Sequence, residues 1–225
     1  MNEQLDKRTV VAASRVKYND GYMPGFGNDF ETEALPGALP VGQNSPQRCP
    51  YGLYAEQLSG TPFTAPRATN KRSWVYRMRP TVQHISAFER IELPLFRSAP
   101  TVGEDTLPLM PLRWDRAPIP DQALSFVTGI RTIATGGDVF TQTGFAIHTF
   151  AVTASMEDDY FYNADGEMLI VPQDGALRFF TEFGIIDIAP GEIAVMPRGV
   201  KFKVTLSGGT SANGYICENY GAHFT

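Results

Sequence analysis

Turn signals that recur at short intervals constrain the fold of this chain more than any other feature of its sequence. In the second half, residue pairs with high turn propensity occur at Asp165-Gly166, Asp174-Gly175, Phe183-Gly184, Pro190-Gly191, Arg198-Gly199, Gly208-Gly209 and Asn213-Gly214. Their spacing is close to the ~8–12 residues expected of short strands in a sandwich or barrel. No long segment shows the period of an amphipathic helix. This half therefore predicts an all-β domain.

The segments between these turns have the length and pattern of strands. In residues 201–206, Phe202, Val204 and Leu206 alternate with lysine and threonine, which predicts that the three apolar side chains point inward. Residues 168–171 and 193–196 are apolar throughout, as is typical of strands buried on both faces. Further strands are expected at 145–152 and 215–220. We predict a mostly antiparallel jelly-roll sandwich or barrel.

The chain divides into three regions by texture. Residues 1–17 are polar and weakly patterned, and we expect a flexible leader there. Residues 18–225 are expected to form one domain, in which 18–122 is an arm of long Pro/Gly-rich loops with covering strands and few short helices. Within this arm, residues 73–79 predict a strand, and 89–122, with its prolines, a covering loop. Residues 123–225 form the core.

Composition excludes several classes of protein. The net charge of −5 argues against nucleic acid as a partner. No apolar run approaches the ~20 residues of a membrane span, and the first residues lack the apolar stretch of a signal peptide. We interpret Cys49 and Cys217 as reduced thiols of a cytoplasmic protein; a disulfide is the alternative, without a framework around it. Whether either thiol has a role is left open.

Several long, irregular strings of residues identify a family. The most informative is CPYGLYAEQLSGTPFTAPRATNKRSWVYRMRP, from Cys49 to Pro80; others are Gly25-Phe26-Gly27-Asn28, GQNSPQ at 42–47, FYNADG at 161–166 and LIVPQ at 169–173. Together, from about Tyr22 onward, they resemble the amino-terminal half of the homogentisate 1,2-dioxygenase family.

The resemblance also extends to the cupin family more broadly. A late cupin motif, G-x5-P-x-G-x2-H, fits Gly191 to Lys201 and then has Phe202 at the histidine position. In the earlier motif, H-x-H-x3-E-x6-G, Phe161, Asn163 and Glu167 stand at the ligand positions and Gly175 follows one residue late. The turns are therefore retained and the imidazoles are not. One carboxylate cannot hold a metal that needs three or four ligands, so we expect no metal site at this frame.

The three histidines do not form a recognisable ligand pattern. A facial iron triad needs two histidines and a carboxylate on one face, and no His-x-His pair occurs. His148 lies among apolar strand residues and is interpreted as a hydrogen-bonded core histidine. His84 and His223 are isolated, and convergence of all three in space is the alternative. We assign no catalytic, cofactor-binding or metal-binding residue in this chain.

Two residue groups keep two interpretations each. The cations Arg67, Lys71, Arg72, Arg77 and Arg79 are interpreted as ion pairs and loop anchors, with attraction of a substrate carboxylate as the alternative. The aromatic residues Tyr51, Tyr54, Phe63, Trp74 and Tyr76 are expected to form a layer between loop and sheet, or an interface.

The resemblance implies a specific activity. It implies Fe(II)-dependent opening of the homogentisate ring by O₂ to maleylacetoacetate in tyrosine and phenylalanine catabolism, in hexamers built as dimers of trimers. The iron ligands of the family are expected in a carboxy-terminal half that this chain lacks, so this half would be scaffold. The alternative is a stand-alone vestigial cupin that acts as a binding or oligomerisation module. Why the chain ends at Thr225, and which contacts build the oligomer, is left open.

Overall fold

The computed structural model describes residues 52–59, 72–84, 87, 89–98, 113, 118–221 and 223–224; for 57–59 and 72–76 only the backbone is described. Ten strands occur in these ranges, and no α-helix. Their bounds are β1 Tyr54–Ser59, β2 Arg72–Arg77, β3 Ile130–Asp138, β4 Thr143–Val152, β5 Glu167–Asp174, β6 Leu177–Thr181, β7 Gly184–Ile188, β8 Ala194–Met196, β9 Phe202–Leu206 and β10 Ala212–Asn219. The predicted leader, residues 1–17, lies outside the described residues.

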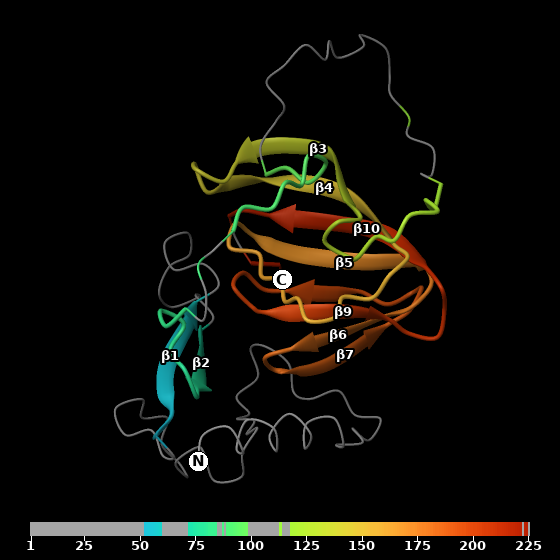
Figure 1. Cartoon of the computed structure of the whole chain (residues 1–225). Helices are drawn as coiled ribbons and strands as arrows, with labels where there is room; N and C mark the ends of the chain where they lie inside the picture. Colours follow the sequence, from blue (N-terminus) through green and yellow to red (C-terminus); the bar gives the residue numbers. More distant parts are fainter. Residues whose placement is uncertain are drawn as a thin grey trace.

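The strands from β3 to β10 build a two-sheet sandwich. A five-stranded sheet has the order β3-β4-β10-β5-β8 and a three-stranded sheet the order β7-β6-β9, and every pairing is antiparallel (Figure 1). After β5 the chain passes from one sheet to the other between most successive strands. Eight strands in two sheets with this winding form a jelly roll, and the all-β, cupin-like prediction is confirmed.

A separate hairpin lies beside the sandwich. Strands β1 and β2 pair antiparallel, from Tyr54 opposite Arg77 to Ser59 opposite Arg72, and Figure 1 shows the pair to one side of the two sheets. The strand predicted over residues 73–79 is therefore present; it begins one residue earlier and ends two residues earlier than predicted. Arg77 forms one ion pair with Glu56 on β1, within the hairpin. A second ion pair, with Glu182 between β6 and β7, attaches the hairpin to the sandwich.

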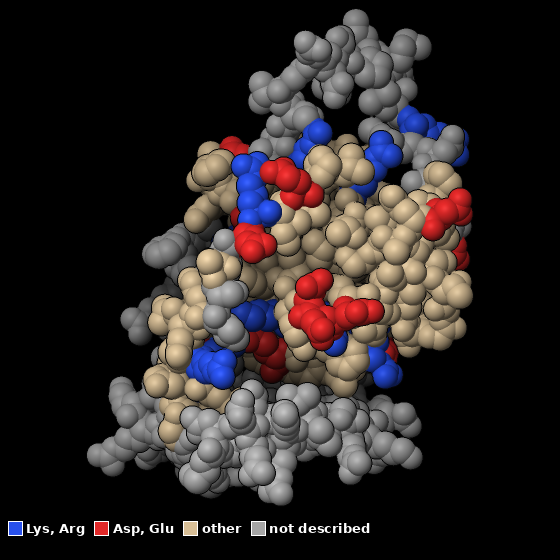
Figure 2. All heavy atoms as spheres, viewed as in Figure 1, with Lys and Arg blue, Asp and Glu red and all other residues tan. Residues whose placement is uncertain are grey.

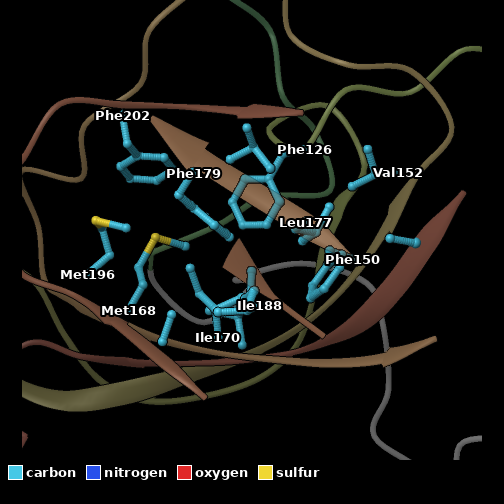
Figure 3. Packing of buried hydrophobic residues seen from close by; sticks show 14 of the residues in the cluster. Phe126, Phe150, Val152, Met168, Ile170, Leu177, Phe179, Ile188, Met196 and Phe202 are labelled. Carbon is cyan, nitrogen blue, oxygen red and sulfur yellow. The ribbon is translucent and has the colours of Figure 1, made fainter. Parts of the chain in front are cut away.

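The hydrophobic core fills the space between the two sheets. Its fully buried side chains come from both, and Figure 3 shows those of β5, β6 and β9 converging with Phe126 and Phe150. Phe202 and Val204 are 0% exposed, as their alternation predicts, and Leu206 packs against the same core from a partly buried position. On the surface, acidic and basic side chains occur in small mixed groups beside a wide uncharged area (Figure 2).

Two predictions about local structure are wrong. Asn213-Gly214 is not a turn, because both residues belong to β10, where the register shifts between them. Gly214 is required there, since a Cβ would lie 2.2 Å from the carbonyl oxygen of Val171 and 2.7 Å from the Phe150 ring. Strand β8 is not buried on both faces within the described structure: Val195 is 36% exposed, and Ile193, just before the strand, is 62% exposed.

Candidate functional site

Two phenylalanines close the interior where the cupin frame would place histidines. Phe161 and Phe202 exchange two backbone hydrogen bonds of 2.8 Å, and their rings meet edge to face with centroids 5.6 Å apart. The Phe202 ring also contacts Phe179 and Phe126 at 5.7 and 6.1 Å. Edge-to-face aromatic contacts of this kind stabilise a packed core. The positions do converge in space, and apolar rings occupy them.

The frame position assigned to Glu167 needs correction. The Glu167 side chain points away from the core, where its Oε1 lies 2.5 Å from His223 Nδ1 and its Oε2 accepts a 2.9 Å hydrogen bond from the Phe224 N–H. Met168 is the residue that faces the core, with 0% exposure. A spacer of four residues instead of three brings Met168 to the carboxylate position and restores the six-residue interval to Gly175. The frame then contains Phe161, Asn163, Met168 and Phe202.

A buried polar network lies beside these aromatic residues. His148, on the inner face of β4, is 0% exposed. Its Nδ1 lies 3.0 Å from Thr132 Oγ1 on β3, and its Nε2 lies 3.0 Å from Glu218 Oε2 on β10. Asn163 donates a 2.5 Å hydrogen bond from Nδ2 to Glu218 Oε1. The Phe96 ring meets the imidazole edge to face at 5.3 Å and covers it. His148 is thus the hydrogen-bonded core histidine that the sequence predicts.

Asn163 also fixes the loop that precedes β5. Its Oδ1 accepts hydrogen bonds from the backbone N–H groups of Asp165 and Gly166 at 2.8 and 3.1 Å, as in an Asx turn. Because its amide donates to Glu218 at the same time, the side chain ties this loop to the central strand β10. The cupin frame would have a metal-binding imidazole at this position. Here the Asn163 side chain binds backbone N–H groups instead.

The electrostatics around this loop follow from burial and from clustered carboxylates. Burial raises the pKa of Asp165, and the nearby negative charge of Glu218 raises it further. Burial lowers the pKa of Arg198, against the attraction of Glu167, Asp165 and Glu218. Arg198 Nη2 also donates a 2.7 Å hydrogen bond to the Tyr220 carbonyl oxygen. The positive charge of Arg198 thus interacts with three carboxylates at this end of the sheet.

The histidines of the chain do not converge. His148 pairs with Glu218 on the inner face of the five-stranded sheet, whereas His223 pairs with Glu167 on the outer face. His84 lies in the segment after β2, at a position with no regular structure. Within the described ranges, no group of three or more His, Cys, Asp or Glu side chains is arranged to hold a metal ion.

The other groups singled out in the sequence are only partly described. Arg77 is a half-buried anchor paired with two glutamates, which matches the structural interpretation of the cations; Arg79 is exposed. Tyr54 is 51% exposed. Cys217 is a free, half-buried thiol. The remaining members lie outside the described residues or have only their backbone described: Cys49, Arg67, Lys71, Arg72, Tyr51, Phe63, Trp74 and Tyr76.

Sequence reasoning missed Glu218, the centre of the polar network. It is 1% exposed on the inner face of β10 and receives contacts from His148, Asn163 and the Tyr220 hydroxyl. The available signal was its place in a strand: Ile216 and Glu218 share one face, so an inward Ile216 requires an inward Glu218. A carboxylate at such a position needs buried partners.

A comparison with known protein families shows to which family the chain belongs. Residues 21–225 match the family described as "Homogentisate 1,2-dioxygenase N-terminal". The chain belongs to this family. Homogentisate 1,2-dioxygenase of Nitrobacter hamburgensis is 64% identical over 225 residues, which is 100% of this chain and 50% of the relative. The enzyme of that name from Rhizobium etli is 59% identical over 223 residues, 99% of this chain and 48% of the relative. The chain thus spans about half the length of these relatives.

Solved structures with partial similarity include cupin-domain proteins. A cupin-2 domain protein from Shewanella frigidimarina matches 40% of this chain and 78% of its own, with 21% identity and a TM-score of 0.33. The cupin domain of Schizosaccharomyces pombe Cnp3 matches 40% of this chain and 64% of its own, with 13% identity and a TM-score of 0.34.

No helix in the described part of the chain has the length and apolar character needed to cross a bilayer.

Proposed function

We propose that this chain is the scaffold half of a homogentisate 1,2-dioxygenase. In this proposal the whole enzyme uses Fe(II) and O₂ to open the ring of homogentisate to maleylacetoacetate in the cytoplasm, during tyrosine and phenylalanine catabolism. It assembles as a hexamer, a dimer of trimers. The observation that carries the proposal is the match of residues 21–225 to the amino-terminal family of these enzymes.

The described residues do not fit the iron that this activity needs. Non-haem Fe(II) takes two histidines and one carboxylate on a common face. Here the cupin frame contains two phenylalanines, a methionine and an asparagine whose amide already donates to Glu218. His148 and His223 are each engaged with a glutamate on opposite faces of the sheet. No reaction step is therefore assigned to this half.

A scaffold role agrees with how the interior is built. Aromatic packing and the hydrogen bonds of His148 and Glu218 join strands β3, β4 and β10 with the loop before β5. Buried polar groups that are fully hydrogen-bonded favour one packing arrangement over others. Such a domain can hold a neighbouring catalytic domain or subunit in a fixed position, which active sites with tight geometric demands require.

Iron loading tests the proposal directly. We expect the chain, loaded anaerobically with Fe(II) and desalted, to retain far less than one equivalent of iron and to show no oxygen uptake with homogentisate. His148→Gln and Glu167→Gln variants should retain the same small amount. Near-stoichiometric iron in the parent, lost in either variant, would overturn the scaffold assignment.

The alternative is a stand-alone vestigial cupin that acts as a binding or assembly module. The exposure of Ile193 and Val195, at 62% and 36%, favours some partner in either case. The coding sequence downstream of Thr225 separates the two functions. An in-frame continuation with a His-x5-Glu segment and later histidines supports the dioxygenase, and a stop codon supports the module.

A further inference from the structure

The outer face of the five-stranded sheet carries an apolar row that crosses all five strands. The strand registers place Val195, Leu169, Cys217, Ile147 and Ala134 side by side. Antiparallel sheets with one face on the core usually present polar side chains on the other. No charged side chain interrupts this row, so the row has the composition of a surface that is covered by protein.

The neighbouring positions extend this apolar surface. Ile193 is 62% exposed and Phe145 45%, while Val171 and Tyr215 are half-buried beside the row. The Phe145 ring lies against Gly136 on β3, where an added Cβ would meet it at 3.1 Å. Contiguous apolar surfaces larger than a few hundred Å² are unusual on soluble monomers and mark interaction sites. The apolar residues at 168–171 and 193–196 therefore indicate a surface that is buried by another segment or protein, and the described residues do not cover it.

The last described residues, His223 and Phe224, lie on this same face. Glu167 lies next to Asn219 in the sheet register, and Asn219 lies next to Phe145. The Glu167 carboxylate is 4% exposed and is held by His223 and by the backbone of Phe224. In the full-length enzyme of the proposed function, the polypeptide after Phe224 therefore begins beside the apolar row. In a protein as long as the relatives, about as many residues follow as precede this point.

We propose that the outer face of the five-stranded sheet is the docking surface for the polypeptide that follows residue 225 in the full-length enzyme. This inference rests on the proposed function, because it treats the chain as one half of a longer polypeptide. The pairs that Glu167 forms with His223 and Phe224 set the position and direction in which that polypeptide enters the interface. A stable interface needs about 800 Å² from each partner, so the neighbouring apolar positions are part of the proposed docking surface together with the row.

Cys217 provides a probe in the middle of this face. The experiment compares two proteins: residues 1–225 alone, and the same residues fused to the second half of the Nitrobacter hamburgensis relative. Both are treated with a small maleimide, and peptide mass spectrometry follows Cys217 separately from every other cysteine. A Phe140→Cys variant of each is the matched control, because Phe140 is 94% exposed in the β3–β4 turn, away from the row.

We expect Cys217 to react roughly tenfold more slowly in the fusion than in the chain alone, as for a site open about one-tenth of the time. The control thiol introduced by Phe140→Cys should be labelled equally in both proteins. Val195→Lys should restore fast labelling of Cys217 in the fusion. In the chain alone, where Val195 is exposed, this substitution should leave the thermal midpoint unchanged. If the fusion does not fold, the second half is added in trans, and protection of Cys217 is expected to rise with its concentration.

Equal labelling of Cys217 in both folded proteins, or no protection in trans, would overturn the proposal. Protection in the chain alone that increases with its own concentration would also overturn it, because a second copy would then be the occupant. Oxygen uptake by the iron-loaded fusion with homogentisate reports on the proposed function separately. Protection of Cys217 without turnover would support the docking surface and contradict the proposed activity. Turnover with a reactive Cys217 would support the activity and contradict the docking surface.

Discussion

The interior of the sandwich has two adjacent parts that are stabilised by different interactions. One part is aromatic: Phe202 packs against Phe161, Phe179 and Phe126. The other is polar: His148, Glu218, Asn163 and Thr132 form hydrogen bonds away from water. The aromatic part stabilises by removing apolar surface from water, a term that varies smoothly with size. The polar part is satisfied only when every partner is present.

The largest effect is expected in the aromatic part. Phe202→Ala should destabilise the domain by roughly 3–5 kcal/mol, because it removes a fully buried ring and leaves a cavity among three others. Urea unfolding followed by fluorescence or circular dichroism measures this. Phe140→Ala, at a 94% exposed ring, is the control and should leave the midpoint nearly unchanged. A Phe202→Ala protein with the parental midpoint would show that the aromatic part does not carry the core.

The polar part should respond to loss of a partner and not to loss of volume. Glu218→Ala is expected to cost about 2–3 kcal/mol, since His148 and Asn163 then remain buried without their acceptor. Glu218→Gln keeps the shape and one acceptor oxygen, and should cost less. The same urea experiment measures both, with the exposed Glu157→Ala as control. Equal losses for Ala and Gln would mean that both carboxylate oxygens are required and that the retained volume and single acceptor contribute nothing.

The smallest effect is a pH dependence at the rim of the polar part. Burial and the charge of Glu218 raise the pKa of Asp165 above its ordinary value of 3.8 in the folded state. The folded protein therefore binds the proton of the Asp165 carboxyl group more tightly than the unfolded chain does. Ionisation of Asp165 at higher pH then lowers the stability of the folded state.

Asp165→Asn removes that cost. The gain in stability over the parent should grow as the pH rises above about 4, the ordinary range of an aspartate, and should level off above the raised pKa. Thermal melts across this range test the sign, with the exposed Asp158→Asn as the matched control. A gain that is independent of pH would point to a cause other than ionisation.

The aromatic part could be predicted from the sequence and the polar part mostly could not. The alternation of Phe202 and Val204 indicated the inward face of β9, and the turn signals indicated the sandwich, because both are local patterns. The Glu218 contacts join residues 70 and 55 positions apart in sequence, and depend on which strands are neighbours. The assignment of Glu167, and not Met168, to the cupin carboxylate position was wrong for the same reason. A one-residue shift exchanges the two faces of a strand.

The outer face shows a second kind of limit. The apolar runs at 168–171 and 193–196 predicted burial on both faces, and the structure contradicts this for β8, where Val195 is 36% exposed. Periodicity reports which surfaces need covering and does not report what covers them. A sequence pattern and a single domain can therefore disagree when the missing term is another part of an assembly.

The strand order has a consequence for synthesis on the ribosome. β10 lies between β4 and β5 in the five-stranded sheet and is the last of the described strands to be translated. Until residues 212–219 emerge, β4 and β5 each have an unpaired edge, and unpaired edges are templates for wrong pairing with other chains. The nascent domain must therefore pass through a stage in which its sheet is split along the middle, and its time of greatest risk of aggregation ends only with its final strand.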